Sequence, residues 1–247
     1  SRREGHESDT AADVTPNPSE YANDSALLKL TSAVPGGPLT FTAEAGRIQQ
    51  ETDVDAFLGV GRFLNTTALA GDDEMLRYRV SLGQALTGAN AAFDSADWSA
   101  YWQGTETEQD TYEVRRAVPP RTPPVQLDRT FKFDESAFGV EFTAVKSLGS
   151  GSIVHDVVYG FEATRSELDE LRNGLQTDLT TGATTPTILG ETFPLRDLPL
   201  STVIEVGAFV QDEVQFDDAR WTLVPALRVD YYELTPETDR IYREDNP

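Results

Sequence analysis

The feature that most limits what this chain can fold into is a period of two in its apolar residues. The period is clearest on the two sides of a polar turn at Asp217-Asp218-Ala219-Arg220, where the apolar positions are Ala208, Val210, Val214, Phe216, Trp221, Leu223, Leu227, Val229 and Tyr231. Successive side chains of a strand point to opposite faces, so this period predicts two antiparallel strands, each with one apolar and one polar wall. Such a hairpin fits a soluble sheet with one buried face, or an outer-membrane barrel whose apolar wall faces lipid. Periodicity does not choose between them.

The same alternation recurs through the chain and predicts about ten strands. Eight of them precede the hairpin, over residues 25–34, 39–53, 75–86, 91–102, 110–118, 127–133, 138–144 and 153–164. Residues 1–23 are expected to form a loop, because Pro16 and Pro18 bar a central strand. Residues 104–108 read as a polar break, and residues 165–174 as one or two helical turns or an extended arm. The predicted fold class is therefore all-β, an antiparallel up-and-down sheet.

The lengths of the connections favour the barrel. Short turns are predicted near 35–38, 87–90, 149–152 and 217–220, and long connections near 55–72 and 175–200. Short and long connections on opposite rims are typical of an up-and-down outer-membrane barrel, with the long loops outside. A brief link at Asp134–Ala137 is the one departure, because this parity would place it on the outer rim.

Charge and composition exclude several classes of protein. There are 42 acidic and 20 basic residues, a formal charge of −22, which argues against a nucleic-acid partner. The excess of acidic residues is typical of a protein adapted to high salt, or of a protein with acidic external loops. Cysteine is absent, so the chain has neither a disulfide nor a thiolate metal site. No apolar run reaches the roughly 18 residues of a transmembrane helix, whereas a barrel strand needs only about 9–11 alternating residues.

The candidate chemical groups do not assemble into a catalytic set or a metal site. The two histidines, His6 and His155, have no partner at ligand spacing, and His155 is expected to be a rim histidine near a turn. No nucleophile–base motif is present, so the chain is not expected to be an enzyme. Acidic pairs such as Asp72-Asp73 or Glu167 with Glu170 read as solvated loop charges. Asn65-Thr66-Thr67 matches the pattern of a glycosylation sequon, and in a bacterial protein it would be an ordinary part of a loop.

Two further sets follow from the strand pattern. In a barrel, one set would share the polar, lumen-facing wall and pair across strands: Glu141, Glu162, Glu205, Arg228 and Asp230. The other is a set of aromatic residues expected toward strand ends, as in the girdle at a bilayer interface: Trp98, Tyr101, Trp102, Tyr112, Trp221, Tyr231 and Tyr232. The polar set equally fits a wetted sheet face, and aromatic-rich strands also occur in soluble sheets.

One long, ordered run of motifs resembles a known family. GETFPLRDLPLS at Gly190–Ser201, GAFVQDE at Gly207–Glu213 and ARWTLVPALRVDYYEL at Ala219–Leu234 are similar to the barrel of TonB-dependent haem/haemoglobin receptors. A further likeness, RREGHE, begins at Arg2. The resemblance covers nearly all of residues 1–247 and is strongest from about Asp128 onward.

The resemblance implies that residues 1–247 are an internal part of the β-barrel domain of a TonB-dependent receptor, with the plug domain and the remaining strands of a barrel of roughly 22 outside it. It implies the outer membrane of a Gram-negative bacterium as location, with outer-membrane lipid around the barrel. The implied ligand is haem or a haem-carrying protein, taken up with energy from TonB, which is reached through the plug. Haem would be a transported ligand and not a covalently bound cofactor. Its ligating histidines are expected outside this stretch, so cofactor-binding residues stay unknown.

Two alternatives remain open on the sequence. The first is a receptor of the same kind for a siderophore or another iron carrier. The second is a soluble acidic β-sandwich that binds a carbohydrate or another surface partner, which would bury its apolar face against a second sheet.

Overall fold

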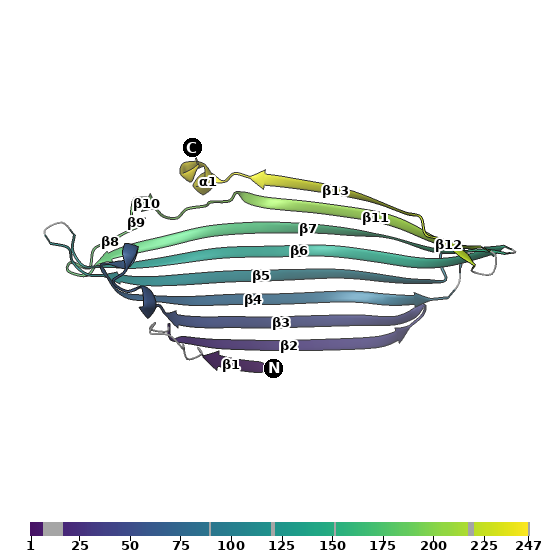
Figure 1. The fold of residues 1–247 in the computed structure, drawn as a ribbon, viewed down its shortest axis with the longest axis horizontal. Helices are drawn as coiled ribbons and strands as arrows, with labels where there is room; N and C mark the ends of the chain where they lie inside the picture. Colours follow the sequence, from purple (N-terminus) through teal and green to yellow (C-terminus); the bar gives the residue numbers. More distant parts are fainter. Residues whose placement is uncertain (7–16, 89, 120–121, 151, 217–219, 247) are drawn as a thin grey trace.

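A computed structural model describes residues 1–6, 17–88, 90–119, 122–150, 152–216 and 220–246. Most of these residues lie in one antiparallel sheet whose strands follow one another in chain order (Figure 1). Its long strands are β2 (Ser19–Val34), β3 (Gly37–Asp53), β4 (Thr66–Thr87), β5 (Ser95–Arg115), β6 (Val125–Ser150), β7 (Ile153–Asp178), β11 (Leu200–Phe216) and β13 (Ala226–Glu237). This arrangement confirms the predicted fold class, a partial and open up-and-down sheet.

The short elements extend this sheet or sit at its ends. They are β1 (Arg2–His6), the 3-10 turns η1 (Asp55–Phe57) and η2 (Gly61–Phe63), β8 (Thr184–Thr185), β9 (Thr187–Ile188), β10 (Glu191–Thr192), β12 (Trp221–Leu223) and the helix α1 (Arg240–Asp245). Strands β12 and β13 continue one register against β11. They are separated at Pro225, which has no N–H to donate to the ladder. No helix of the described part is long and apolar enough to cross a membrane.

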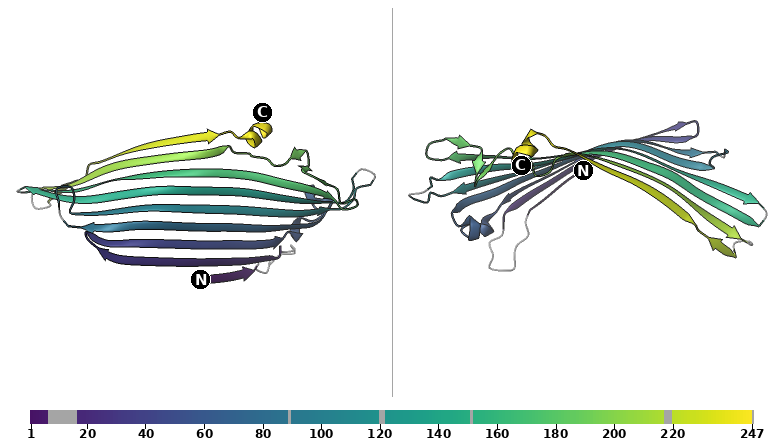
Figure 2. Two further views of the ribbon diagram at one scale, coloured as in Figure 1. Left: turned by 180° about the vertical axis from the view of Figure 1, so that it is seen from behind. Right: turned by 90° about the horizontal axis from the view of Figure 1, so that it is seen from above.

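The sheet is a single twisted layer, with its first and last strands at opposite edges (Figure 2). β1 and β2 lie at one edge and β13 at the other, and in the described residues these edges do not pair with each other. The only other sheet in the described residues is the two-stranded β9–β10 pair. No second sheet therefore covers the apolar face, as a β-sandwich would require.

The strands are longer than the sequence pattern predicted, and two predicted breaks are wrong. Residues 104–108 are interior to β5 and residues 134–137 to β6, both in unbroken registers. Residues 165–174 are extended within β7, which confirms the extended alternative and not the helical turns. The predicted pair of strands around the 134–137 link is therefore one strand. Residues 1–23 are also not all loop, since β1 and the start of β2 lie there. The predicted connection at 55–72 ends earlier, because β4 begins at Thr66.

Strand β6 shows why the pattern was misread. Phe138, Val140 and Phe142 occupy one face, whereas Leu127, Phe131 and Phe133 occupy the other. The two halves of the strand thus have different environments: Leu127 is buried against the 179–199 connection, whereas Phe138 is exposed on the other face. The apolar residues change from one face of β6 to the other, although the strand and its hydrogen bonds to its neighbours continue without a break.

The connections segregate by rim, as predicted. At one rim, at the right in Figure 1, β2 turns into β3 at Pro35–Gly36, and β4, β6 and β11 end at Thr87, Ser150 and Phe216. The opposite rim carries the connections at 54–65, 116–124 and 179–199. Residues 89, 151 and 217–219 of the predicted short turns lie outside the described residues. With residues 134–137 inside β6, the one exception to the parity disappears.

An apolar band crosses the entire sheet on one face. Its central row contains one residue from each long strand, each register-paired with the next: Leu30, Phe41, Leu82, Ala100, Val140, Ala163, Val206 and Tyr231. In β6 the band extends from Phe138 to Ala144 and in β11 from Ile204 to Val210. Many of these side chains are strongly exposed in this single layer, Leu30 and Phe138 among them. At the short-turn end of the band Ala96 and Ala144 are buried, because the 88–94 connection contacts Tyr159 and Lys146 there. Over the rest of the band, no described residues cover this apolar face, as a lipid-facing wall requires.

The sheet projects well beyond this band on the long-loop side. Residues 125–137 of β6 lie past Phe138, which corresponds to about 40 Å of strand at about 3.4 Å per residue. Here the opposite face is covered. Leu127 of β6 forms a small buried core with Ile188, Phe193 and Leu195 of the 179–199 connection.

Candidate functional site

The face opposite the apolar band is polar at the same level of the sheet. The row adjacent to the central apolar row again takes one residue from each long strand: Thr31, Thr40, Gly83, Ser99, Glu141, Glu162, Gly207 and Asp230. Because neighbours along a strand point to opposite faces, each long strand carries an apolar residue on one side and a polar residue or glycine on the other. We call this second surface the polar wall.

The register brings the five predicted wall residues to this one surface. Arg228 and Asp230 of β13 lie two residues apart on the face that also carries Glu162, and Arg228 forms ion pairs with both carboxylates. Glu141 is opposite Glu162 in the register and accepts a hydrogen bond from Ser99 at 3.4 Å. The fifth residue, Glu205, is exposed on the same face. Cross-strand pairing was thus predicted correctly for the Glu162–Arg228 pair.

Tyr101 belongs to the polar wall, contrary to the prediction. Together with Tyr232 it was assigned to an interfacial girdle, but both side chains are on the polar face. The Tyr101 ring lies over Gly139 of the next strand, where a Cβ would overlap it. The Arg79 guanidinium stacks 4.0 Å from the ring centroid, and the hydroxyl is 3.5 Å from Thr164 Oγ1. One side chain therefore ties β4, β5, β6 and β7 together across the wall.

The other girdle residues lie on the same face as the apolar band. Trp98 and Trp102 are two rows apart on β5, opposite Phe142 and Phe138 of β6. Tyr231 belongs to the central row, and Trp221 is beside the short-turn rim. Tyr112 is far out on β5, ten residues past Trp102 (112 − 102) and well beyond the band. Of the seven predicted girdle residues, Trp98, Trp102 and Tyr231 are therefore part of the apolar band, and the described residues do not form two separate rings.

A buried polar cluster anchors the 179–199 connection to the sheet at the long-loop rim. The guanidinium of Arg196 binds Asp169 and donates to the Glu170 carbonyl at 2.6 Å, and its Nε is 3.4 Å from Asp239. The Glu170 carboxylate accepts the backbone N–H groups of residues 197 and 198 at 2.8 and 3.2 Å. With Glu170 only 3% exposed, its prediction as a solvated loop charge is wrong.

This cluster also joins the 179–199 connection, which follows β7, to the segment that follows β13. Asp239 and Asn246 flank α1, beyond the end of β13, and Asn246 Nδ2 donates to the Arg196 carbonyl at 3.1 Å. Beside them Arg172 pairs with Asp197 at 3.1 Å and with Glu191 at 3.3 Å. The only sign of this cluster in the sequence is the adjacent pair Arg196-Asp197. The pair lies in the motif GETFPLRDLPLS, which indicated a family but not a buried cluster.

A second buried carboxylate, Glu113, lies near the outer end of β5. It accepts hydrogen bonds from Thr66 at 2.6 Å and Arg115 at 2.7 Å, and Arg129 is 3.6 Å away. Burial alone would raise the pKa of Glu113, but these hydrogen bonds and positive charges outweigh it, so its pKa lies below the usual value. Thr66 is itself buried, so the prediction of the 65–67 sequon as loop chemistry is wrong at this position.

The histidines have ordinary surroundings. His155 Nδ1 is 2.7 Å from an Asp212 carboxylate oxygen, close to the short-turn rim as predicted. His6 is exposed in β1, opposite Glu20. Asp72 and Asp73 lie within β4, so their prediction as loop charges is wrong. Across the described residues, no group of three or more His, Cys, Asp or Glu side chains is placed to hold a metal ion.

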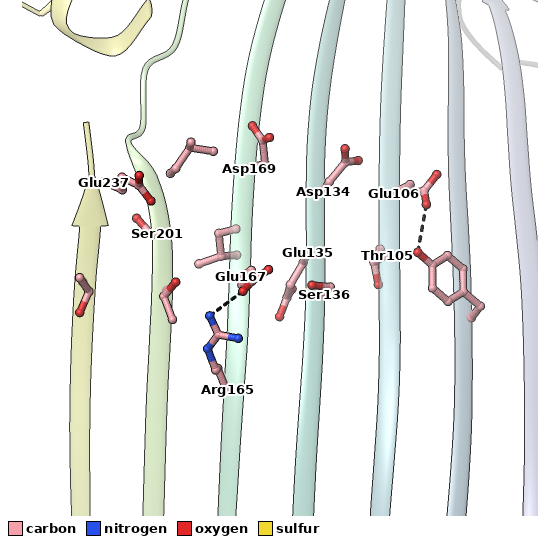
Figure 3. Close-up of a pocket in the computed structure, with 15 residues that line it drawn as sticks. Thr105, Glu106, Asp134, Glu135, Ser136, Arg165, Glu167, Asp169, Ser201 and Glu237 are labelled. Atoms are coloured by element: carbon pink, nitrogen blue, oxygen red, sulfur yellow. Dashed lines mark hydrogen bonds and ion pairs between the residues drawn. The ribbon is translucent and has the colours of Figure 1, made fainter. Parts of the chain in front are cut away.

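An open acidic hollow lies on the band face, just beyond the band toward the long-loop rim (Figure 3). Glu106, Asp134, Glu167 and Asp169 line it from three neighbouring strands, and Arg165 pairs with Glu167 at 2.7 Å. On these strands the apolar face therefore gives way to charged residues. A lipid-facing wall requires such a boundary where it leaves the hydrocarbon core.

A single sheet with a continuous apolar band on one face, a polar wall on the other, and short and long connections on opposite rims is part of the wall of a transmembrane β-barrel. The comparison with family models identifies which kind. The chain belongs to the TonB-dependent receptor β-barrel family, because the model described as "TonB dependent receptor-like, beta-barrel" matches residues 12–246. This is a family of outer-membrane receptors that take up ligands in partnership with TonB. The comparison with curated proteins gave no match.

Proposed function

We propose that this chain forms part of the barrel of an outer-membrane receptor that takes up haem, free or delivered by a haem-carrying protein. The observation that carries the transport part is the pairing of the apolar band with the polar wall along the same strands. One face is suited to lipid, and the other lines a water-filled path. Haem as the ligand is supported by the motif likeness at residues 190–201, 207–213 and 219–234.

The proposed roles within the chain follow from the geometry. The polar wall lines the transport path, and the Glu162–Arg228–Asp230 ion pairs supply fixed charge along it. The segment 179–199, anchored by Arg196, covers this side of the sheet at the outer mouth. Energy for uptake comes from TonB in the periplasm, through a plug domain that is not part of residues 1–247.

The test is haem-dependent growth of a Gram-negative haem auxotroph that has lost its own haem receptor. The full-length receptor should reach the outer membrane, show heat-modifiable gel mobility and restore growth on haem only when TonB is present. Outer-membrane recovery without growth on haem, but with growth on a ferric siderophore, would replace haem by the siderophore alternative. Recovery as a soluble protein would refute the proposal as a whole.

A further inference from the structure

The connection between β3 and β4, residues 54–65, has a fixed shape that its backbone provides. Val60 donates to the Phe57 carbonyl at 3.2 Å, Phe63 to the Val60 carbonyl at 2.9 Å, and Gly59 to the Phe63 carbonyl at 3.0 Å. The side chain of Asn17 accepts from the backbone N–H of Ala56 at 2.9 Å. Gly59 and Gly61 have positive φ, which lets the two 3-10 turns follow each other so closely.

This ordered connection presents apolar side chains to water. Phe57, Val60 and Leu64 are 54%, 61% and 58% exposed. The rings of Phe57 and Phe63 are stacked, with centroids 6.2 Å apart and planes inclined by 22°. Hydrogen bonds hold the loop in a shape that leaves its apolar groups uncovered, so its free energy falls when a ligand covers them.

Two guanidinium groups flank these apolar side chains. Arg62 is 4.5 Å from the centroid of the Phe63 ring. Arg116, from the neighbouring 116–124 connection, donates to the Leu64 carbonyl and to Asn65 Oδ1, each at 3.3 Å. Both arginines are exposed, in a chain with 42 acidic and only 20 basic residues. The one acidic residue of the connection is Asp55. An exposed apolar surface that carries aromatic rings and is edged by cations complements an apolar anion that has an aromatic face of its own.

We propose that this surface, which we call the outer aromatic platform, is a docking site for a planar, apolar small molecule that carries carboxylate groups. The platform is defined by Phe57, Val60, Phe63 and Leu64 with Arg62 and Arg116. Its small size favours a small molecule over a protein, because a stable protein interface involves about 20–30 residues a side. The platform lies on the long-loop rim, so an external ligand reaches it before the polar wall. A porphyrin fits this chemistry, and in naming it the inference rests on the proposed function.

The test uses the full-length receptor in outer-membrane vesicles and protoporphyrin IX as the fluorescent probe. The double variant F57S/V60S should bind the probe about tenfold or more weakly, because it removes one ring of the stacked pair and the aliphatic side chain of the platform with the highest exposed fraction. The matched control is L189S/L198S, two exposed leucines of the 179–199 connection, which should bind like the wild type. Arg62→Gln should weaken binding of the diacid but not of its dimethyl ester.

Unchanged probe binding in F57S/V60S, or an equal loss in the control, would overturn the proposal, and so would a wild type that does not bind the probe. Should F57S/V60S not reach the outer membrane, Arg62→Gln decides alone, since it alters one exposed side chain. The proposed function fails separately. If the wild type supports no growth on haem while probe binding depends on the platform, haem is wrong as the cargo and the platform stands. If the wild type grows on haem and the platform variants bind the probe like the wild type, only the proposed docking site is wrong.

Discussion

Replacing Val206 by lysine tests the face assignment most directly, because the same change at Val203 supplies the control. Both valines are in β11, but Val206 belongs to the central row of the apolar band and Val203 is on the polar face. A lysine on the lipid face costs about 2–4 kcal/mol at the bilayer midplane and about 0–1 near an interface. Val206 is in the second of the four band rows that β11 contributes between Ile204 and Val210, so we expect about 2–3 kcal/mol.

Lysine at Val203 should cost less than about 1 kcal/mol, because its amine reaches water on the polar side. The measurement is urea-induced unfolding of the full-length receptor refolded in lipid vesicles, followed by tryptophan fluorescence, with gel mobility as a check of folding. The full-length receptor is needed because residues 1–247 leave two sheet edges unpaired. Equal costs at the two positions would refute the barrel assignment, and a larger cost at Val203 would mean that the two faces are reversed.

Three further predictions concern the wall and the outer rim. Gly139→Ala should cost about 1–3 kcal/mol in the same unfolding assay, since its Cβ would overlap the Tyr101 ring, and Tyr101→Ala should remove most of that cost in a double-mutant cycle. Arg196→Met should remove the ion pairs with Asp169 and Asp239 and the hydrogen bond to the buried Glu170 carbonyl, which costs about 1–3 kcal/mol and should speed proteolysis of the 179–199 connection in intact outer membranes. Wild-type cleavage rates would contradict the anchoring role. The pKa of Glu113 is lower in the folded protein than in the unfolded chain, so its ionised form stabilises the fold. This stabilisation is fully present above the unfolded pKa of about 4.3, and it is lost as the pH falls through the lower pKa of the folded protein. In Glu113→Gln, acid unfolding should therefore depend less steeply on pH below about 4.3, and an unchanged slope would count against the burial of this carboxylate.

The structure also explains how a strongly acidic chain can be a membrane protein. Charged residues replace the apolar band where the strands pass toward the long loops, as at Glu106, Asp134 and Glu167. On the opposite face, the polar wall carries Glu141 and Glu162 side by side. The charge is thus placed on the parts of the sheet that contact water, and the band itself stays apolar.

The sequence by itself determined the architecture of this part of the barrel. A period of two fixes which residues share a face, because each strand residue turns its side chain through about 180°. That rule alone placed Glu141, Glu162 and Arg228 on one wall, and the turn signals placed short and long connections on opposite rims. The motif likeness supplied the family, which no periodicity could supply.

Only the tertiary structure decided where the strands end and what covers them. The polar residues at 104–108 and 134–137 resemble breaks in the sequence because both faces of a strand can be wetted outside the bilayer, while the backbone hydrogen bonds to neighbouring strands continue. The buried Arg196–Glu170 cluster depends on contacts between segments about 26 residues apart, and the contact of Tyr101 with Gly139 spans two strands. Such pairings are set by register and by the folding back of a long connection, and neither leaves a local pattern in the sequence.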